Sequence, residues 1–193
     1  MVRLPEHQVD PLFPRRWSPR AMSGAPISRD ALLSLLEAAR WAPSGGNAQP
    51  WRFVYAVRET PGFEALFDCL EPGNQEWCKR AGALALLSAQ MIRSSGRPAP
   101  SAPLECGAAF MAFALQGTLA GLVVHPMGGF DRERVRLAAG LVPGMEPQLM
   151  IAVGHPGSVE DLSERNRARE EPSGREPVSA WAHEGRWSGA GTP

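Results

Sequence analysis

This chain of 193 residues lacks a net charge, because 20 Lys and Arg side chains are balanced by 20 Asp and Glu side chains. A balanced chain has no overall field to attract nucleic acid or an anionic membrane, so we expect neither as a partner. Cysteine is scarce: Cys69, Cys78 and Cys106 form no CxxC pair, and an odd number cannot all be paired in disulfides. We therefore expect reduced thiols in a cytoplasmic protein.

Long hydrophobic runs are also missing. The first sixteen residues mix charges and prolines without an apolar segment, so we expect no signal peptide. The longest apolar run, 107–124, contains Gln116 and Thr118 and is short for a membrane span. It is more typical of a buried helix that leads into a strand.

Several familiar site motifs are absent as well. The sequence contains no HxxxH, HExxH or Cys/His cluster, so we expect no metal site. It has no GxSxG elbow, no GxxxxGK[ST] loop and no GxGxxG after a strand. The motifs typical of serine hydrolases, P-loop NTPases and Rossmann dehydrogenases are therefore missing from this sequence.

The periodicity that is present predicts one domain of mixed helices and strands. Helices are expected at 28–42, 61–70, 73–82, 104–121 and 131–141, and strands at 51–57, 122–127 and 148–154. The apolar stretch 83–91 fits a buried strand or a buried helix, and 93–105 is a Pro- and Ser-rich linker or lid. We divide the chain into an N-terminal extension (1–14), a domain (15–157) and a charged C-terminal arm (158–193). The arm has too few apolar residues to form its own core.

The stretch PRRWSPRAM contains the first candidate site. Arg16 and Arg20 flank Ser18, and guanidinium and hydroxyl groups together can bind a phosphate monoester. Arg175, in PSGREP, could add a second positive point from the other end of the chain. Taken alone, the motif is more typical of a solvated basic segment near the terminus than of a phosphate site.

The loop APSGGNAQPW concentrates side-chain amides. Asn47 and Gln49 can each donate and accept, as the edge of a heterocycle such as a flavin or a base requires. Pro43 and Pro50 would stiffen the loop. The alternative is an ordinary turn whose polar side chains, Ser44 included, cap neighbouring backbone groups.

Two further turns are candidates. In PGNQEW, Asn74 supplies another amide, with Trp77 one helical turn later. In HPMGGFD, the amides of Gly128 and Gly129 are not shielded by side chains, so they could donate to a ligand ring, while Asp131 caps the next helix. Each could also be a plain connection.

The order of these segments carries more information than any one of them. The segments follow one another in the order RRWSPRAM, LLEAARWAPSGGNAQPWRFV, GNQEW, ECGAAFMAFALQGTLAGLVVHPMGGFD and PSGREP. In this order the chain resembles the FMN-dependent nitroreductase family, from about Arg15 to Arg175. The resemblance implies an α+β fold with a central, mostly antiparallel sheet flanked by helices. It also implies an intertwined homodimer with a C-terminal arm, and FMN as cofactor with NADH or NADPH as electron donor.

The resemblance also implies site roles. The phosphate-binding residues would be Arg16, Trp17, Ser18, Arg20 and Arg175. The flavin ring and ribityl chain would be bound by Pro43, Ser44, Asn47, Gln49, Asn74, Pro126, Met127, Gly128 and Gly129. Trp77, placed where some members have Lys, would face the pocket, and no side chain would act as a catalytic acid or base.

The activity implied is reduction of nitroaromatics, quinones or similar flat acceptors by NAD(P)H, in a ping-pong mechanism. Three alternatives remain open: a flavin-sequestering protein with little turnover, a dedicated reductase of one metabolite, and a phosphate- or nucleic-acid-binding module that uses the same arginines.

Overall fold

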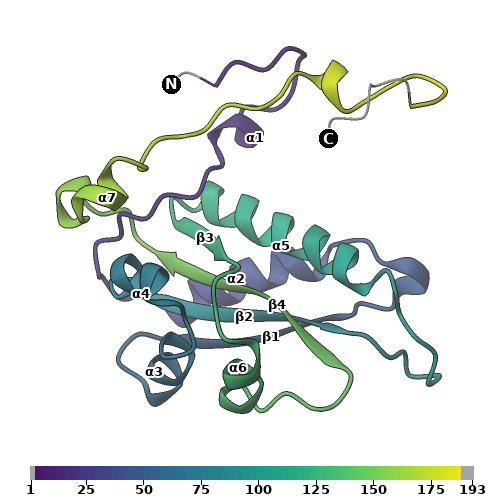
Figure 1. Ribbon diagram of the computed structural model, residues 1–193, viewed down its shortest axis with the longest axis horizontal. Helices are drawn as coiled ribbons and strands as arrows, with labels where there is room; N and C mark the ends of the chain where they lie inside the picture. The colour runs from purple at the N-terminus through teal and green to yellow at the C-terminus, as the bar shows by residue number, and fades with distance from the viewer. Residues whose placement is uncertain (1–2, 188–193) are drawn as a thin grey trace.

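The computed structural model describes residues 3–187 and has a four-stranded antiparallel sheet at its centre (Figure 1). The strands are β1 (Trp51–Val57), β2 (Ala83–Gln90), β3 (Val123–Met127) and β4 (Met145–Gly154). Their spatial order is β1-β2-β4-β3, so β1 and β3 are the two edges. An antiparallel sheet flanked by helices is the predicted α+β fold.

The ambiguous stretch 83–91 is the central strand β2. Every residue from Ala83 to Ala89 is buried, because both faces of this strand are covered. Burial on both sides removes the alternation by which a strand is usually recognised in a sequence.

Helices cover both faces of the sheet. α2 (Arg29–Arg40) and α5 (Ala102–Leu119) pack on one face, and α3 (Pro61–Phe67), α4 (Pro72–Cys78) and α6 (Arg132–Ala138) pack on the other. Ser28 caps α2 by accepting from the Ala31 N–H, and Asp131 caps α6, both as predicted. The predicted bounds were two residues off: α2 ends at Arg40, and α5 covers 102–119 instead of 104–121.

The remaining elements are short. They are α1 (Leu12–Arg15), α7 (Glu164–Arg167) and 3-10 turns at Gly45–Asn47, Val159–Asp161 and Val178–Ala180. The predicted linker or lid forms a small hairpin, in which Ile92 pairs with Pro98 and the Arg93 N–H donates to the Arg97 carbonyl. No helix of the described residues is long and apolar enough to cross a membrane.

The two chain ends run side by side above the body (Figure 1). The C-terminal arm first packs on the body, where Leu162 and Asn166 are buried, and then extends along residues 3–20. Trp181 and Trp187 are 60% and 63% exposed. The last six residues of the predicted arm, 188–193, lie outside the described residues, and the division into three segments stays a prediction.

Candidate functional site

Three arginines from the two chain ends lie close together: Arg3, Arg16 and Arg175. The pKa of Arg16 is lowered by burial and by the positive charges of the other two. The pKa of Arg3 is lowered by burial and by Arg175. None of the three forms an ion pair with a carboxylate among residues 3–187. Like charges without a counter-charge repel one another, so this cluster favours a bound anion.

Hydrogen bonds to backbone carbonyls hold the cluster in place. Arg3 Nη1 donates to the carbonyls of Pro14, at 2.9 Å, and Arg16, at 2.8 Å. Arg3 Nε donates to the Ser173 carbonyl at 3.0 Å, 170 residues away in the chain. One guanidinium therefore joins the segment that contains Arg16 to the arm that contains Arg175.

Two of the other phosphate candidates also have defined partners. Arg16 Nη1 donates to the Ser18 hydroxyl at 3.3 Å, which brings both predicted groups together. Arg175 Nη1 donates to the Ser173 hydroxyl at 3.1 Å and to the Gly174 carbonyl at 2.7 Å. Arg16, Ser18 and Arg175 thus lie together, and their role in binding a phosphate stays a prediction.

The Arg20 side chain has partners of a different kind. Its guanidinium donates to the Arg169 carbonyl at 3.2 Å and lies 3.9 Å from the Glu170 carboxylate, whose side chain is only 3% exposed. Glu170 also accepts from the backbone N–H groups of Arg20 and Ala21, at 2.7 to 2.9 Å. Glu170 therefore fastens the arm to the N-terminal segment, and Arg20 already has a negative partner.

His125 joins this segment to the sheet. Its Nδ1 lies 2.8 Å from the Pro19 carbonyl, and its ring packs on Trp77 with centroids 4.4 Å apart. Burial lowers the His125 pKa to about 4, so the ring is neutral near pH 7 and Nδ1–H donates to Pro19. The expectation that Trp77 faces the pocket is wrong: its side chain is 4% exposed, in the core.

The turn after β3 is fixed by the segment that leads into α4. The Gly129 carbonyl accepts from the Glu71 N–H, at 3.1 Å, and from Asn74 Nδ2, at 2.9 Å. A Cβ on Gly129 would lie 2.6 Å from Glu71 Oε2 and 2.9 Å from Asn74 Nδ2. A side chain at residue 129 would clash with Glu71 and Asn74, so Gly129 docks closely because it has none. Its carbonyl is engaged, and the expectation that its N–H donates to a ligand stays a prediction.

Gly128, by contrast, is open. It is exposed, and a Cβ there would meet nothing within 4 Å. Its N–H has no acceptor in the described part of the protein. Pro126 is half-buried and Met127 is buried, so Gly128 is the member of this turn that can present its backbone to a ligand.

The amide-rich loop 43–50 lies elsewhere. Asn47 and Gln49 are exposed, with φ of 55° and 46°, and the Gln49 N–H donates to the Ser44 hydroxyl at 2.9 Å. The loop enters β1 at one edge of the sheet, whereas the Gly128 turn follows β3 at the other edge. Three strand spacings separate these edges, about 14 Å. Within residues 3–187, no hydrogen bond or ion pair joins Pro43, Ser44, Asn47 or Gln49 to the other candidate residues.

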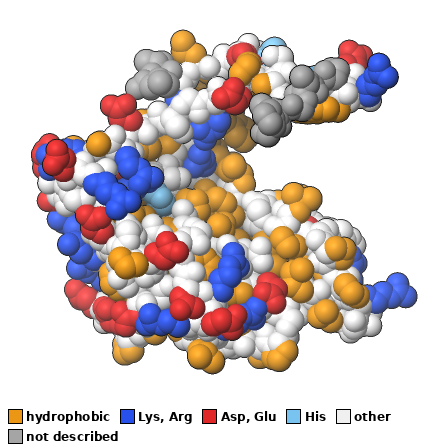
Figure 2. All heavy atoms as spheres, viewed as in Figure 1, with side chains coloured by type: hydrophobic (Ala, Val, Ile, Leu, Met, Phe, Trp, Pro, Cys, Tyr) orange, Lys and Arg blue, Asp and Glu red, His pale blue; other side chains and the backbone are white. Residues whose placement is uncertain are grey.

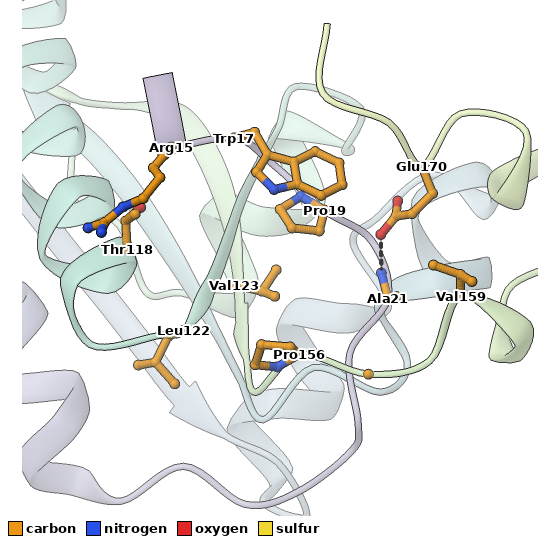
Figure 3. Close-up of a pocket in the computed structure, with 11 residues that line it drawn as sticks. Arg15, Trp17, Pro19, Ala21, Thr118, Leu122, Val123, Pro156, Val159 and Glu170 are labelled. Carbon is orange, nitrogen blue, oxygen red and sulfur yellow. Dashed lines mark hydrogen bonds between the residues drawn. The ribbon is translucent and has the colours of Figure 1, made fainter. Parts of the chain in front are cut away.

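A cavity of about 330 Å³ between the N-terminal segment and the body is lined by one predicted site residue, Trp17 (Figure 3). Trp17 lies there beside Pro19, while Arg15 extends towards Thr118 on α5. The cavity separates the N-terminal segment from the body and is lined mainly by apolar groups such as Leu122, Val123 and Pro156. The arginine cluster is not part of its wall.

Comparison with known proteins decides the family. The model of the nitroreductase family matches residues 14–68 and 57–155, more than half of the chain. The chain belongs to the nitroreductase family. The sequence-based resemblance is therefore confirmed.

Individual nitroreductase relatives agree. A protein of Thermus thermophilus named NADH dehydrogenase is 30% identical over 177 residues, covering 74% of this chain and 83% of that protein. The crystal structure of an oxidoreductase containing FMN is 37% identical, covers 97% of each chain and has a TM-score of 0.94. A nitroreductase family protein from Clostridium difficile, 22% identical, shares the fold with a TM-score of 0.70 over 91% of this chain and 97% of its own.

Arg3 and Glu170 were missed by the sequence reasoning. Arg3 stands alone near the N-terminus with no motif around it, and Glu170 is one of several charges in a polar tail. Only the pairing of the two chain ends shows what they contact. The sequence offered no signal for either.

Proposed function

We propose that this nitroreductase family member is an FMN-dependent oxidoreductase that uses NADH or NADPH to reduce flat acceptors such as nitroaromatics and quinones. The observations that carry the proposal are the cluster of uncompensated guanidiniums and the open glycine turn after β3, the strand to which His125 joins the segment that contains Arg16. A phosphate dianion is opposite in charge to this cluster. Guanidinium groups can also donate paired hydrogen bonds to the phosphate oxygens. FMN, when bound, supplies the redox chemistry between the nicotinamide and the acceptor.

The residues of this chain have distinct tasks in that proposal. Arg16, Ser18 and Arg175 would bind the phosphate. The Gly128 N–H, which has no acceptor among residues 3–187, and the side-chain carbonyl oxygen of Asn74, whose Nδ2 is already bonded to Gly129, would bind the ring system. Neutral His125 keeps the phosphate-binding segment on β3. No side chain is assigned as a catalytic acid or base.

The protein is proposed to be a homodimer, and the single chain gives two reasons. The loop 43–50 is remote from the other candidate residues, so a second subunit is needed to complete a flavin site that includes it. Apolar side chains also remain exposed: Leu33 on α2, Leu104, Met111 and Leu119 on α5, and Trp181 on the arm. Figure 2 shows an open hollow between the arm and the body, which a second copy would fill.

Reduction kinetics test the activity. The FMN-loaded protein should lose its flavin absorbance when mixed anaerobically with NADH or NADPH, and regain it on addition of a quinone or nitrofuran. If neither nucleotide bleached the flavin, the reductase proposal would fail, and flavin sequestration would be the better account. We expect the protein in the cytoplasm, where Cys69, Cys78 and Cys106, all buried and free, stay reduced.

Subunit complementation tests the shared site. Homodimers of Arg16→Gln or of Asn47→Leu should each bind FMN weakly. In a mixed dimer, one site would contain both substitutions and the other neither, so half of the sites should regain the wild-type affinity. Absence of such recovery, or a monomer by light scattering that still binds FMN, would contradict the dimeric site.

A further inference from the structure

The Arg3 guanidinium is placed to do more than hold the backbone. Its Nε and Nη1 donate to three carbonyls, those of Pro14, Arg16 and Ser173. Its Nη2 has no acceptor among the described residues, so two N–H groups remain available. The side chain is half-buried, and the charges of Arg16 and Arg175 act on it directly.

Arg20 shows why a further cation is needed. Its charge faces Glu170, and its guanidinium donates to the Arg169 carbonyl. A guanidinium that is already matched by a buried carboxylate gains less from a phosphate than one that is unmatched. Arg3, Arg16 and Arg175 form no ion pair within residues 3–187, so their positive charges are unmatched there.

We infer that Arg3 is a phosphate-binding residue of the flavin site, and that Arg20 is chiefly a structural partner of Glu170. The inference rests on the proposed FMN site. In it, Arg3 binds the phosphate through Nη2 while its other donors hold Pro14, Arg16 and Ser173. One side chain thus provides charge and also fixes the distance between the other two cations.

The preference for FMN over riboflavin measures a phosphate contact, because the two flavins differ only in that group. Both affinities are to be measured by quenching of flavin fluorescence in flavin-free protein. Arg3→Gln should weaken FMN binding about tenfold or more, as expected for loss of a charge-assisted hydrogen bond, and leave riboflavin binding unchanged. Arg20→Gln should weaken FMN binding less than Arg3→Gln does.

Arg15→Gln is the matched control, since Arg15 is an exposed neighbour that lies outside the cluster and its loss changes the net charge equally. It should leave the FMN affinity as it is. Arg3→Lys keeps the charge but cannot serve all three carbonyls and the phosphate, so it should lose affinity to an intermediate degree. This second variant also covers the case in which Arg3→Gln does not fold.

The outcomes are separable. Equal losses of FMN and riboflavin affinity in Arg3→Gln would make Arg3 a backbone clamp only, and unchanged affinities would remove it from the site; either result overturns the inference. Failure of the wild-type protein to bind FMN would instead refute the proposed function, and the role of Arg3 with it. Loss of FMN binding alone, with riboflavin unaffected and with part of the lost FMN affinity retained in Arg3→Lys, which keeps the charge but not the clamp, supports the phosphate contact.

Discussion

The body of the protein and its two chain ends are held together by different forces. In the body, apolar side chains are buried on both faces of the sheet, as Leu84 on one face and Ile151 on the other illustrate. At the chain ends, no described apolar residue before Ala21 or after Asn166 is buried. Their contacts are hydrogen bonds and charges, such as those of Arg3 and Glu170.

The stability of the body and that of the chain ends therefore depend on different interactions. Burial of apolar groups stabilises the body whatever is bound. The chain ends gain little from burial within one chain, so their position depends on a few polar contacts and on whatever anion or second subunit binds there. The proposed phosphate site therefore lies in the less stable region, and substitutions there can change its position without unfolding the body.

The largest effect is expected where the N-terminal segment crosses the end of β4. A Cβ on Gly157 would lie 2.4 Å from the carbonyl carbon of Met22 and 2.7 Å from the Ser23 nitrogen. These are backbone atoms and cannot turn aside, so Gly157→Ala should lower the free energy of unfolding by about 3 kcal/mol. Chemical denaturation measures this change.

Gly107→Ala provides the matched control. Gly107 is exposed on α5, and an added Cβ meets nothing within 4 Å. There the substitution should raise stability by about 0.5–1 kcal/mol, because alanine favours helix. Similar effects at the two glycines would contradict the close backbone contact at Gly157.

The next effect is a loss of stability in acid, which comes from the contact between β3 and the N-terminal segment. His125 has a folded pKa of about 4, below its ordinary value of 6.5, because burial disfavours its charged form. Above pH 6.5 both states are neutral. As the pH falls, the unfolded state binds a proton first, so stability decreases by about 2 kcal/mol between pH 7 and 5.

His125→Phe isolates this contribution, because phenylalanine keeps an aromatic ring against Trp77 but cannot titrate. Denaturation curves for both proteins should be compared between pH 7 and 5, above the range in which most carboxylates titrate. The variant should lose less stability over this interval than the wild type. If the free energy of unfolding changed equally with pH in the two proteins, His125 would not be a buried neutral group.

A smaller and more local effect is expected at Glu170. Glu170→Gln replaces a buried carboxylate with an amide. The substitution removes the negative charge opposite Arg20 and one of the two side-chain oxygens that accept hydrogen bonds. The free energy needed to detach the arm should fall by about 1–2 kcal/mol, as expected for a weakened charge-assisted hydrogen bond. Limited proteolysis should cut the arm faster while the melting temperature of the body changes little.

Glu171→Gln, at the exposed neighbouring position, should leave the proteolysis rate of the arm as in the wild type. If both variants were cut alike, the contacts of Glu170 would not be what holds the arm. If Glu170→Gln melted the whole protein, the separation between body and chain ends would be wrong.

The sequence predicted the body better than the chain ends, for a physical reason. Local periodicity and capping residues were sufficient for α2, α6 and β1, as Ser28 and Asp131 show. Arg16, Ser18 and Arg175 were assigned to a phosphate site through the order of motifs, and this assignment stays a prediction. The pairing of Arg3 with Ser173, and of Glu170 with Arg20, joins residues about 150 to 170 positions apart through polar contacts. No hydrophobic pattern reports such contacts.

Misplaced residues have the same origin. Trp77 was expected in the pocket because of its position in a motif, but helix α4 directs it onto His125 in the core. Gly128 and Gly129 look alike in the sequence, and only the docking of Glu71 and Asn74 distinguishes them. Side-chain direction and long-range docking are tertiary properties, which a motif alone does not specify.

The smallest effect is expected at an exposed ion pair on the body. Arg40 Nη2 lies 2.5 Å from Glu37 Oε1, a shorter distance than the one between Arg20 and Glu170, but the two side chains are 58% and 53% exposed. Water and salt already solvate both charges, so the pair adds little despite its geometry. Glu37→Gln should leave the melting temperature unchanged at physiological ionic strength. A loss as large as that of arm docking in Glu170→Gln would mean that distance, and not burial, determines what a carboxylate contributes in this protein.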